Sequence, residues 1–126
     1  MGNYYLEGTE RTPEIRIDAD NGIIEIRGRS MPENTDGFFR SFQEKLIDFV
    51  RNPAPSINVV LDLDYFNTAT SKTIVDLIES LSELFKSGHP VKVEFIYEED
   101  DWDMKDTGDD LVQLYGSMIQ LTTKEL

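Results

Sequence analysis

Alternating apolar and charged side chains predict that the chain opens with a pair of β-strands. The alternation runs over residues 14–18 and resumes over residues 23–27. The dipeptide Asn21-Gly22 between these runs predicts a type I′ hairpin turn, which requires positive φ at both central residues. The first twelve residues show no clear period and are expected to form an arm or a short edge strand.

Helical spacing of apolar residues appears in three later segments. Residues 38–50 form one broad apolar face, and Pro53 ends this helix. The apolar positions of residues 74–85 step by helical intervals, with Gly88 placed where a helix ends. A shorter helix is expected over residues 106–115.

Strand-like alternation separates these helices and sets the predicted fold class. It covers residues 56–64 and 91–97, and residues 118–121 could add a last short strand. The resulting order, ββαβαβα(β), predicts an α/β fold with a mixed sheet, in which the hairpin is antiparallel and the other strands are parallel. Because the strands alternate, the helices are expected mainly on one face. Residues 1–126 are expected to form a single domain.

The charge balance narrows the classes of partner. The chain has 25 acidic and 12 basic residues, for a net charge of −13. Such a field repels nucleic acid and anionic lipid and favours basic protein partners. The sequence holds no cysteine, and no apolar run approaches the ~20 residues that span a bilayer. Without a signal-peptide pattern at the start, a cytoplasmic protein without membrane insertion is expected.

The acidic stretch 98–110 does not have the spacing of a calcium loop. Counted from Asp101, Lys105 falls at a ligand position and Asp106 stands where the loop needs glycine. Neither a metal nor another cofactor is therefore expected, and solvation explains the stretch, with docking of a basic partner as the alternative. The single histidine, His89, follows a predicted helix end and is expected to lie in a loop.

Two aspartates at the end of the strand over residues 56–64 raise an enzymatic alternative. Asp62-Leu63-Asp64 resembles the opening motif of haloacid-dehalogenase-type phosphatases, whose first carboxylate attacks phosphorus. Phe66 departs from that motif, which has Thr or Val at this position. Carboxylates two residues apart also simply share one face of a strand. A small phosphatase that depends on Asp62 is the less favoured reading.

Small polar residues fill the junction from this strand into the next helix. Asn67, Thr68, Thr70 and Ser71 are residue types that cap helices. A hydroxyl group at the carboxyl end of a strand is also well placed for phosphorylation, since the N–H groups of a helix start accept an anion. Lys72 lies within reach of a phosphate on Thr68, whereas nearby carboxylates would oppose it.

Motifs along most of the chain match one bacterial family. The matching segments are Gly8-Thr9, Thr12 to Ile15, Gly28 to Asn34, Phe38-Phe39 and, most specifically, Leu61 to Lys72. On these segments the chain resembles the SiaC-type regulatory phosphoproteins, small bacterial domains related in architecture to the STAS anti-sigma-factor antagonists.

The resemblance implies a phospho-switch that has no catalytic residues. A partner kinase phosphorylates the threonine matching Thr68, and a PP2C-type phosphatase reverses the reaction. The unmodified form binds and activates a diguanylate cyclase, which links it to cyclic-di-GMP signalling, aggregation and biofilm formation. The expected switch surface around Thr68 consists of Asp62, Asp64, Asn67, Thr70, Ser71 and Lys72. Modification of Thr70 or Ser71, and a protein-binding module that is never phosphorylated, stay open as alternatives.

Overall fold

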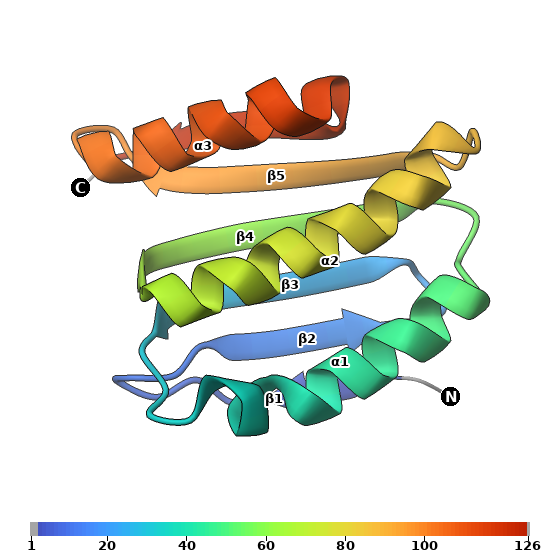
Figure 1. Ribbon diagram of the computed structural model, residues 1–126, viewed down its shortest axis with the longest axis horizontal. Helices are drawn as coiled ribbons and strands as arrows, with labels where there is room; N and C mark the ends of the chain where they lie inside the picture. Colours follow the sequence, from blue (N-terminus) through green and yellow to red (C-terminus); the bar gives the residue numbers. More distant parts are fainter. Residues whose placement is uncertain (1–2, 126) are drawn as a thin grey trace.

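A six-stranded sheet with three helices on one face forms the fold (Figure 1). The computed structural model describes residues 3–125. The elements follow in the order β1 (Tyr4–Leu6), β2 (Glu14–Asp18), β3 (Ile23–Ser30), α1 (Thr35–Arg51), β4 (Ile57–Phe66), α2 (Thr68–Lys86), β5 (Val91–Glu98), α3 (Trp102–Tyr115), a 3₁₀ turn (Gly116–Met118) and β6 (Ile119–Lys124).

The sheet is mixed, as predicted. Strands β1, β2 and β3 pair antiparallel, whereas β3 to β6 pair parallel, and the strands lie in the sheet in chain order. The predicted edge strand is β1, and the predicted final strand is β6. Helix α3 begins four residues before its predicted start, because the Asp101 carboxylate caps it by accepting a hydrogen bond from the Met104 N–H at 3.1 Å.

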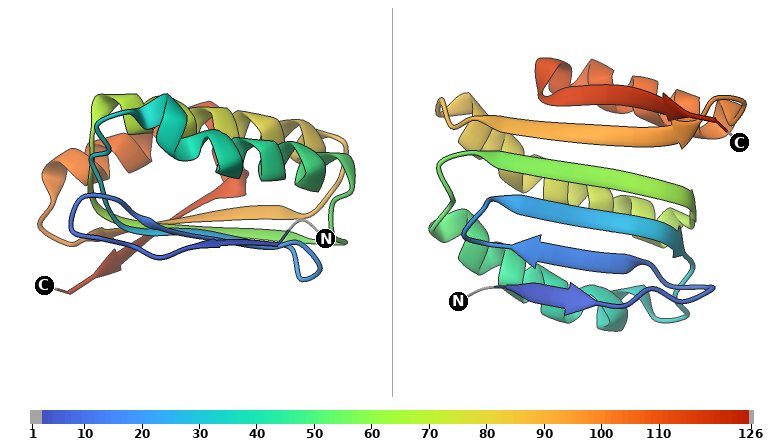
Figure 2. Two further views of the ribbon diagram at one scale, coloured as in Figure 1. Left: turned by 90° about the horizontal axis from the view of Figure 1, so that it is seen from below. Right: turned by 180° about the vertical axis from the view of Figure 1, so that it is seen from behind.

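All three helices cover the same face of the sheet, so the other face is open (Figure 2). The covered face buries the alternating apolar residues of the strands, such as Ile15, Ile26 and Leu61, against helix residues that include Phe42 and Leu81. The open face carries the polar and charged residues of the same strands. Among residues 3–125, no helix combines the length and the apolar character needed to cross a membrane.

The β2–β3 hairpin forms where predicted, but its turn is of another kind. Asp18 pairs with Ile23, so the four residues from 19 to 22 make the connection. Gly22 has a φ of 68°, whereas no other residue type has a positive φ in the described part of the chain, which excludes a type I′ turn at Asn21. Gly22 also lies against the residue just before β4, since an added Cβ would fall 1.9 Å from the Ser56 carbonyl oxygen.

Gly108 brings α3 close to the sheet. It is buried, and a Cβ there would lie 2.7 Å from Cδ2 of Leu121 and 3.1 Å from Cδ1 of Phe95. Glycine lowers helix propensity by about 1 kcal/mol relative to alanine. Here the cost is offset by the close packing that the missing side chain permits.

Candidate functional site at the junction of β4 and α2

A backbone hydrogen bond connects the junction to the neighbouring strand β3. The Asn67 N–H donates a hydrogen bond to the Ser30 carbonyl at the end of β3, at 3.0 Å. The side-chain oxygen of Asn67 accepts a hydrogen bond from the Thr70 N–H at 2.8 Å and so caps α2. The predicted helix cap is therefore confirmed, and its residue is Asn67.

Thr70 holds the first turn of α2 against the sheet. Its hydroxyl lies 2.8 Å from the hydroxyl of Ser30, and both side chains are fully buried. The expectation that Thr70 belongs to an exposed switch surface is therefore wrong. Its side chain lies on the face of α2 that turns toward the core, where Ser30 satisfies the hydroxyl.

Thr68 and Ser71 lie on the outer side of the same turn. Thr68 is the first residue of α2 and is exposed, whereas Ser71 is only partly exposed. The Ser71 hydroxyl donates to the Thr68 carbonyl oxygen at 2.6 Å, a bond that serine often makes to nearby backbone. Of the three hydroxyl-bearing residues at the junction, Thr68 is the most exposed.

The start of α2 offers a favourable place for added negative charge. Its first turn contains no acidic residue, and the N–H groups of a helix start carry partial positive charge. Lys72, expected to assist a phosphate on Thr68, instead pairs with Asp76 at 3.1 Å, and both side chains are largely exposed. An exposed pair of this kind contributes little stability, so Lys72 can exchange partners.

The two aspartates of β4 lie on the open face of the sheet, away from the helices. Leu61 and Leu63 are buried beneath the helices, so the alternating Asp62 and Asp64 point the other way. Asp62 pairs with Arg27 at 3.2 Å and Lys124 at 2.7 Å, and Asp64 pairs with Lys124 at 3.2 Å. The structure thus separates Asp62 and Asp64 from the outer side of α2 that carries Thr68.

Asp62 has structural partners on both of its carboxylate oxygens. Arg27 binds Oδ2 and Lys124 binds Oδ1, which connects strands β3, β4 and β6 across the open face. The hydrogen bond to Asp62, and then that to Asp64, raises the pKa of Lys124 above its ordinary value. In the described part of the chain, no three acidic or histidine side chains gather closely enough to hold a metal ion.

Residues at the end of β3 also contribute to the junction, and local sequence patterns did not indicate their role. Ser30 is 40 residues from its partner Thr70. Beside it, the guanidinium of Arg29 lies 5.7 Å from the ring centre of Tyr65, which is 46% exposed at the end of β4. Arg29 and Ser30 belong to the segment Gly28 to Asn34, but no spacing rule links that segment to β4 or α2.

His89, the remaining residue singled out by type, lies at the opposite end of α2. Its Nε2 contacts the carbonyl oxygen of Ala54, in the connection between α1 and β4. This contact joins two loops, and it lies at the amino end of the parallel strands, whereas Thr68 lies at their carboxyl end.

Comparisons with known proteins agree over almost the whole chain. Residues 6–124 match a family model described as SiaC family regulatory phosphoprotein. An uncharacterized protein of Pseudomonas aeruginosa (strain UCBPP-PA14) is 29% identical over 98 residues, which are 78% of each chain.

Solved structures from Pseudomonas aeruginosa share the fold. One is SiaC in a complex with the diguanylate cyclase SiaD, whose activator it is, with a TM-score of 0.88, 22% identity, and coverage of 96% of this chain and 99% of that one. Another is apo-SiaC, with a TM-score of 0.83, 23% identity, and coverage of 97% and 99%.

Proposed function

Because the chain belongs to the SiaC family of regulatory phosphoproteins, we propose that it is a non-catalytic cytoplasmic switch with its regulatory phosphate on Thr68. A partner kinase adds the phosphate, and a PP2C-type phosphatase removes it. The unmodified form binds and activates a diguanylate cyclase, and so acts through cyclic-di-GMP on aggregation and biofilm formation. The similarity in fold to SiaC, the activator of SiaD, supports the choice of a cyclase as effector.

The accessibility of the Thr68 hydroxyl carries this proposal. A kinase needs a hydroxyl that can enter its own active site. Thr68 is exposed at the start of α2. By contrast, Thr70 is fully buried against Ser30, and the Ser71 hydroxyl is already hydrogen-bonded to the backbone carbonyl of Thr68. The exposed position coincides with the threonine that the family resemblance selects.

The rigid frame of the junction suggests how the phosphate acts. A phosphoryl group adds about −1.5 to −2 charges at neutral pH. The Asn67 cap and the Ser30–Thr70 bond hold the backbone on both sides of Thr68, so the fold stays as it is. The added charge then weakens the binding of a partner that packs over Thr68. The phosphate would lose its hydration in the interface, and it would repel acidic groups of the partner.

Phosphorylation with a candidate kinase and ATP tests the site. Intact mass and peptide mapping should show one phosphate on the wild-type protein, located at Thr68. Thr68→Ala should remain unmodified, and Ser71→Ala, which removes a neighbouring hydroxyl, should be phosphorylated like the wild type. A Thr68→Ala protein that is phosphorylated as efficiently as the wild type would refute the assignment.

Binding to a candidate cyclase tests the switch. Thr68→Asp should weaken binding by roughly tenfold or more, about 1.4 kcal/mol, with an unchanged melting temperature. Thr68→Ala should bind as the unmodified wild type does. If protein isolated from cells never carries phosphate, even after loss of the phosphatase, a constitutive binding module becomes the better description.

A further inference from the structure

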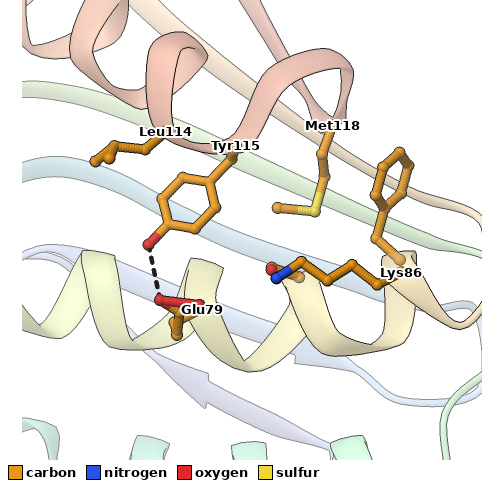
Figure 3. A pocket seen from close by; sticks show the side chains of 7 residues that line it. Glu79, Lys86, Leu114, Tyr115 and Met118 are labelled. Atoms are coloured by element: carbon orange, nitrogen blue, oxygen red, sulfur yellow. Dashed lines mark hydrogen bonds between the residues drawn. The ribbon is translucent and has the colours of Figure 1, made fainter.

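A hollow of about 380 Å³ opens between α2 and α3, at the end of α2 that lies far from Thr68 (Figure 3). Tyr115 of α3 reaches toward α2, and its hydroxyl donates to the Glu79 carboxylate at 3.3 Å. Met118 lies between the two helices in the same view. The side chains that line the hollow are Glu79, Ser82, Phe85, Lys86, Leu114, Tyr115 and Met118.

Apolar surface is available in and beside this hollow. Leu114 is 69% exposed and Phe85 is 36% exposed, while Met118 is almost fully buried. Burial of one leucine side chain is worth about 1.5–3 kcal/mol. A partner that covered Leu114 and Phe85 would therefore gain appreciable hydrophobic stabilisation.

Acidic residues outnumber basic ones around the hollow, although Lys86 is among the residues that line it and Lys72 pairs with Asp76. On α2, Asp76 and Glu83 are exposed and lie on the same side of the helix as Glu79. On α3, the exposed Asp110 lies one turn before Leu114. Burial is the main reason why the pKa of Tyr115 is raised, and the charges of Glu79 and Asp76 add to this shift.

We propose that this hollow docks a basic amphipathic helix of a partner protein, whose apolar side chains cover Leu114 and Phe85 while its Lys or Arg residues meet the acidic rims. Charge complementarity selects this occupant. A second copy of the chain carries the same net charge of −13 and would repel. Nucleic acid and anionic lipid are repelled for the same reason.

The docking site is separate from the proposed phosphorylation site. Glu79 lies roughly 16 Å and Phe85 roughly 26 Å from Thr68 along α2, at 1.5 Å rise per residue. A helix bound in the hollow would therefore stay bound when Thr68 is phosphorylated. The inference goes beyond the proposed switch and does not depend on it.

NMR titration of the isotope-labelled full chain tests this proposal. The probe is a synthetic amphipathic peptide of Leu and Lys with about five helical turns, roughly 18 residues, and its control is a scrambled peptide of identical composition. Shift changes should cluster on the carboxyl half of α2 and on α3, and the scrambled peptide should bind more weakly. Changes spread over the acidic surface, or no binding at millimolar peptide, would overturn the proposal.

Matched variants separate the hollow from general charge attraction. Leu114→Ser should reduce peptide affinity about tenfold, in line with the burial of one leucine. Ile47→Ser, which removes a 52% exposed apolar side chain from α1, should leave the affinity unchanged, as should Thr68→Asp. Equal effects of Leu114→Ser and Ile47→Ser would contradict the assignment.

A charge variant provides a second measurement that does not depend on Leu114. Replacing both Glu79 and Glu83 with Gln should weaken peptide binding about threefold and reduce its dependence on salt. Unaltered binding and salt dependence would show that these rims do not select the occupant. Sedimentation that detected a dimer abolished by Leu114→Ser would assign the hollow to a second copy instead.

Discussion

The two ends of α2 differ in the surroundings of their side chains: polar groups at the amino end are hydrogen-bonded, whereas apolar groups at the carboxyl end are partly exposed. At the amino end, Asn67 caps the helix, and the buried hydroxyls of Thr70 and Ser30 bond to each other. At the carboxyl end, Phe85 and the neighbouring Leu114 leave apolar surface exposed beside a hollow. The amino end is thus suited to presenting one hydroxyl in a fixed position, and the carboxyl end to contributing contact area.

This contrast separates two ways in which one helix can serve a regulatory protein. A charge added to a rigid, polar end alters what can pack there, without a change of fold. An exposed apolar end instead contributes to the affinity for a partner. A charge several helical turns away hardly affects that affinity. Variants at each end should therefore change different measured quantities.

The largest effect on stability is expected from Thr70→Val, which removes the hydroxyl but keeps the shape of the side chain. The Ser30 hydroxyl would be left buried without its partner, at a cost of about 1–3 kcal/mol. Denaturant unfolding measures this loss. We also expect slower phosphorylation of Thr68, since the first turn of α2 would be less firmly held.

The double variant Ser30→Ala/Thr70→Val sharpens this test. Removing both partners leaves no unsatisfied group, so the double variant should lose less stability than the sum of the single losses. Additive losses would mean that the two hydroxyls do not stabilise each other. The amino end of α2 would then not be held rigidly by this pair of hydroxyls.

A smaller loss, about 1 kcal/mol, is expected from Asn67→Ala, because it removes the cap of α2. Asn34→Ala is the matched control, since Asn34 caps α1 by accepting from the Gly37 N–H at 3.1 Å. Thermal unfolding should show similar losses for both variants. Hydrogen exchange at the Thr70 N–H and the phosphorylation rate of Thr68 should change only in Asn67→Ala, and equal changes in both would argue against local control by the cap.

The smallest effect concerns the proton of Tyr115 at the carboxyl end. The pKa of Tyr115 is raised in the folded state, first by burial and then by Glu79, above its ordinary value of about 10. This contribution to stability is present below pH ~10 and is lost as pH rises through the raised pKa. Glu79→Gln should lower the pKa of Tyr115, while burial still keeps it raised.

NMR titration of the tyrosine rings measures this shift and includes an internal control. The pKa of Tyr5 is also raised, mainly by its hydrogen bond to Glu14 on the open face of the sheet. Glu79→Gln should leave the titration of Tyr5 unchanged. If Tyr115 titrated as in the wild type, Glu79 would not contribute to the negative rim of the hollow.

Periodicity along the chain was enough to predict most elements of this fold and to place Thr68 at the junction of a strand and a helix. Alternation identified β2 to β5, helical spacing identified α1 and α2, and the residue types at the junction predicted a cap. These features depend on neighbours within a few residues, where backbone geometry and side-chain preference act directly. The family resemblance carried by Leu61 to Lys72 then implied Thr68 as the site of modification, which stays a prediction.

Contacts between distant segments could not be predicted in this way. The burial of Thr70 depends on Ser30, 40 residues earlier, and the pairing of Asp62 depends on Lys124, 62 residues later. The form of the hairpin turn depends in part on how Gly22 meets the backbone of Ser56. The hollow lies between α2 and α3, and its presence depends on how these two helices pack on the sheet. Because that packing involves whole elements, it could not be predicted from a local pattern of side chains.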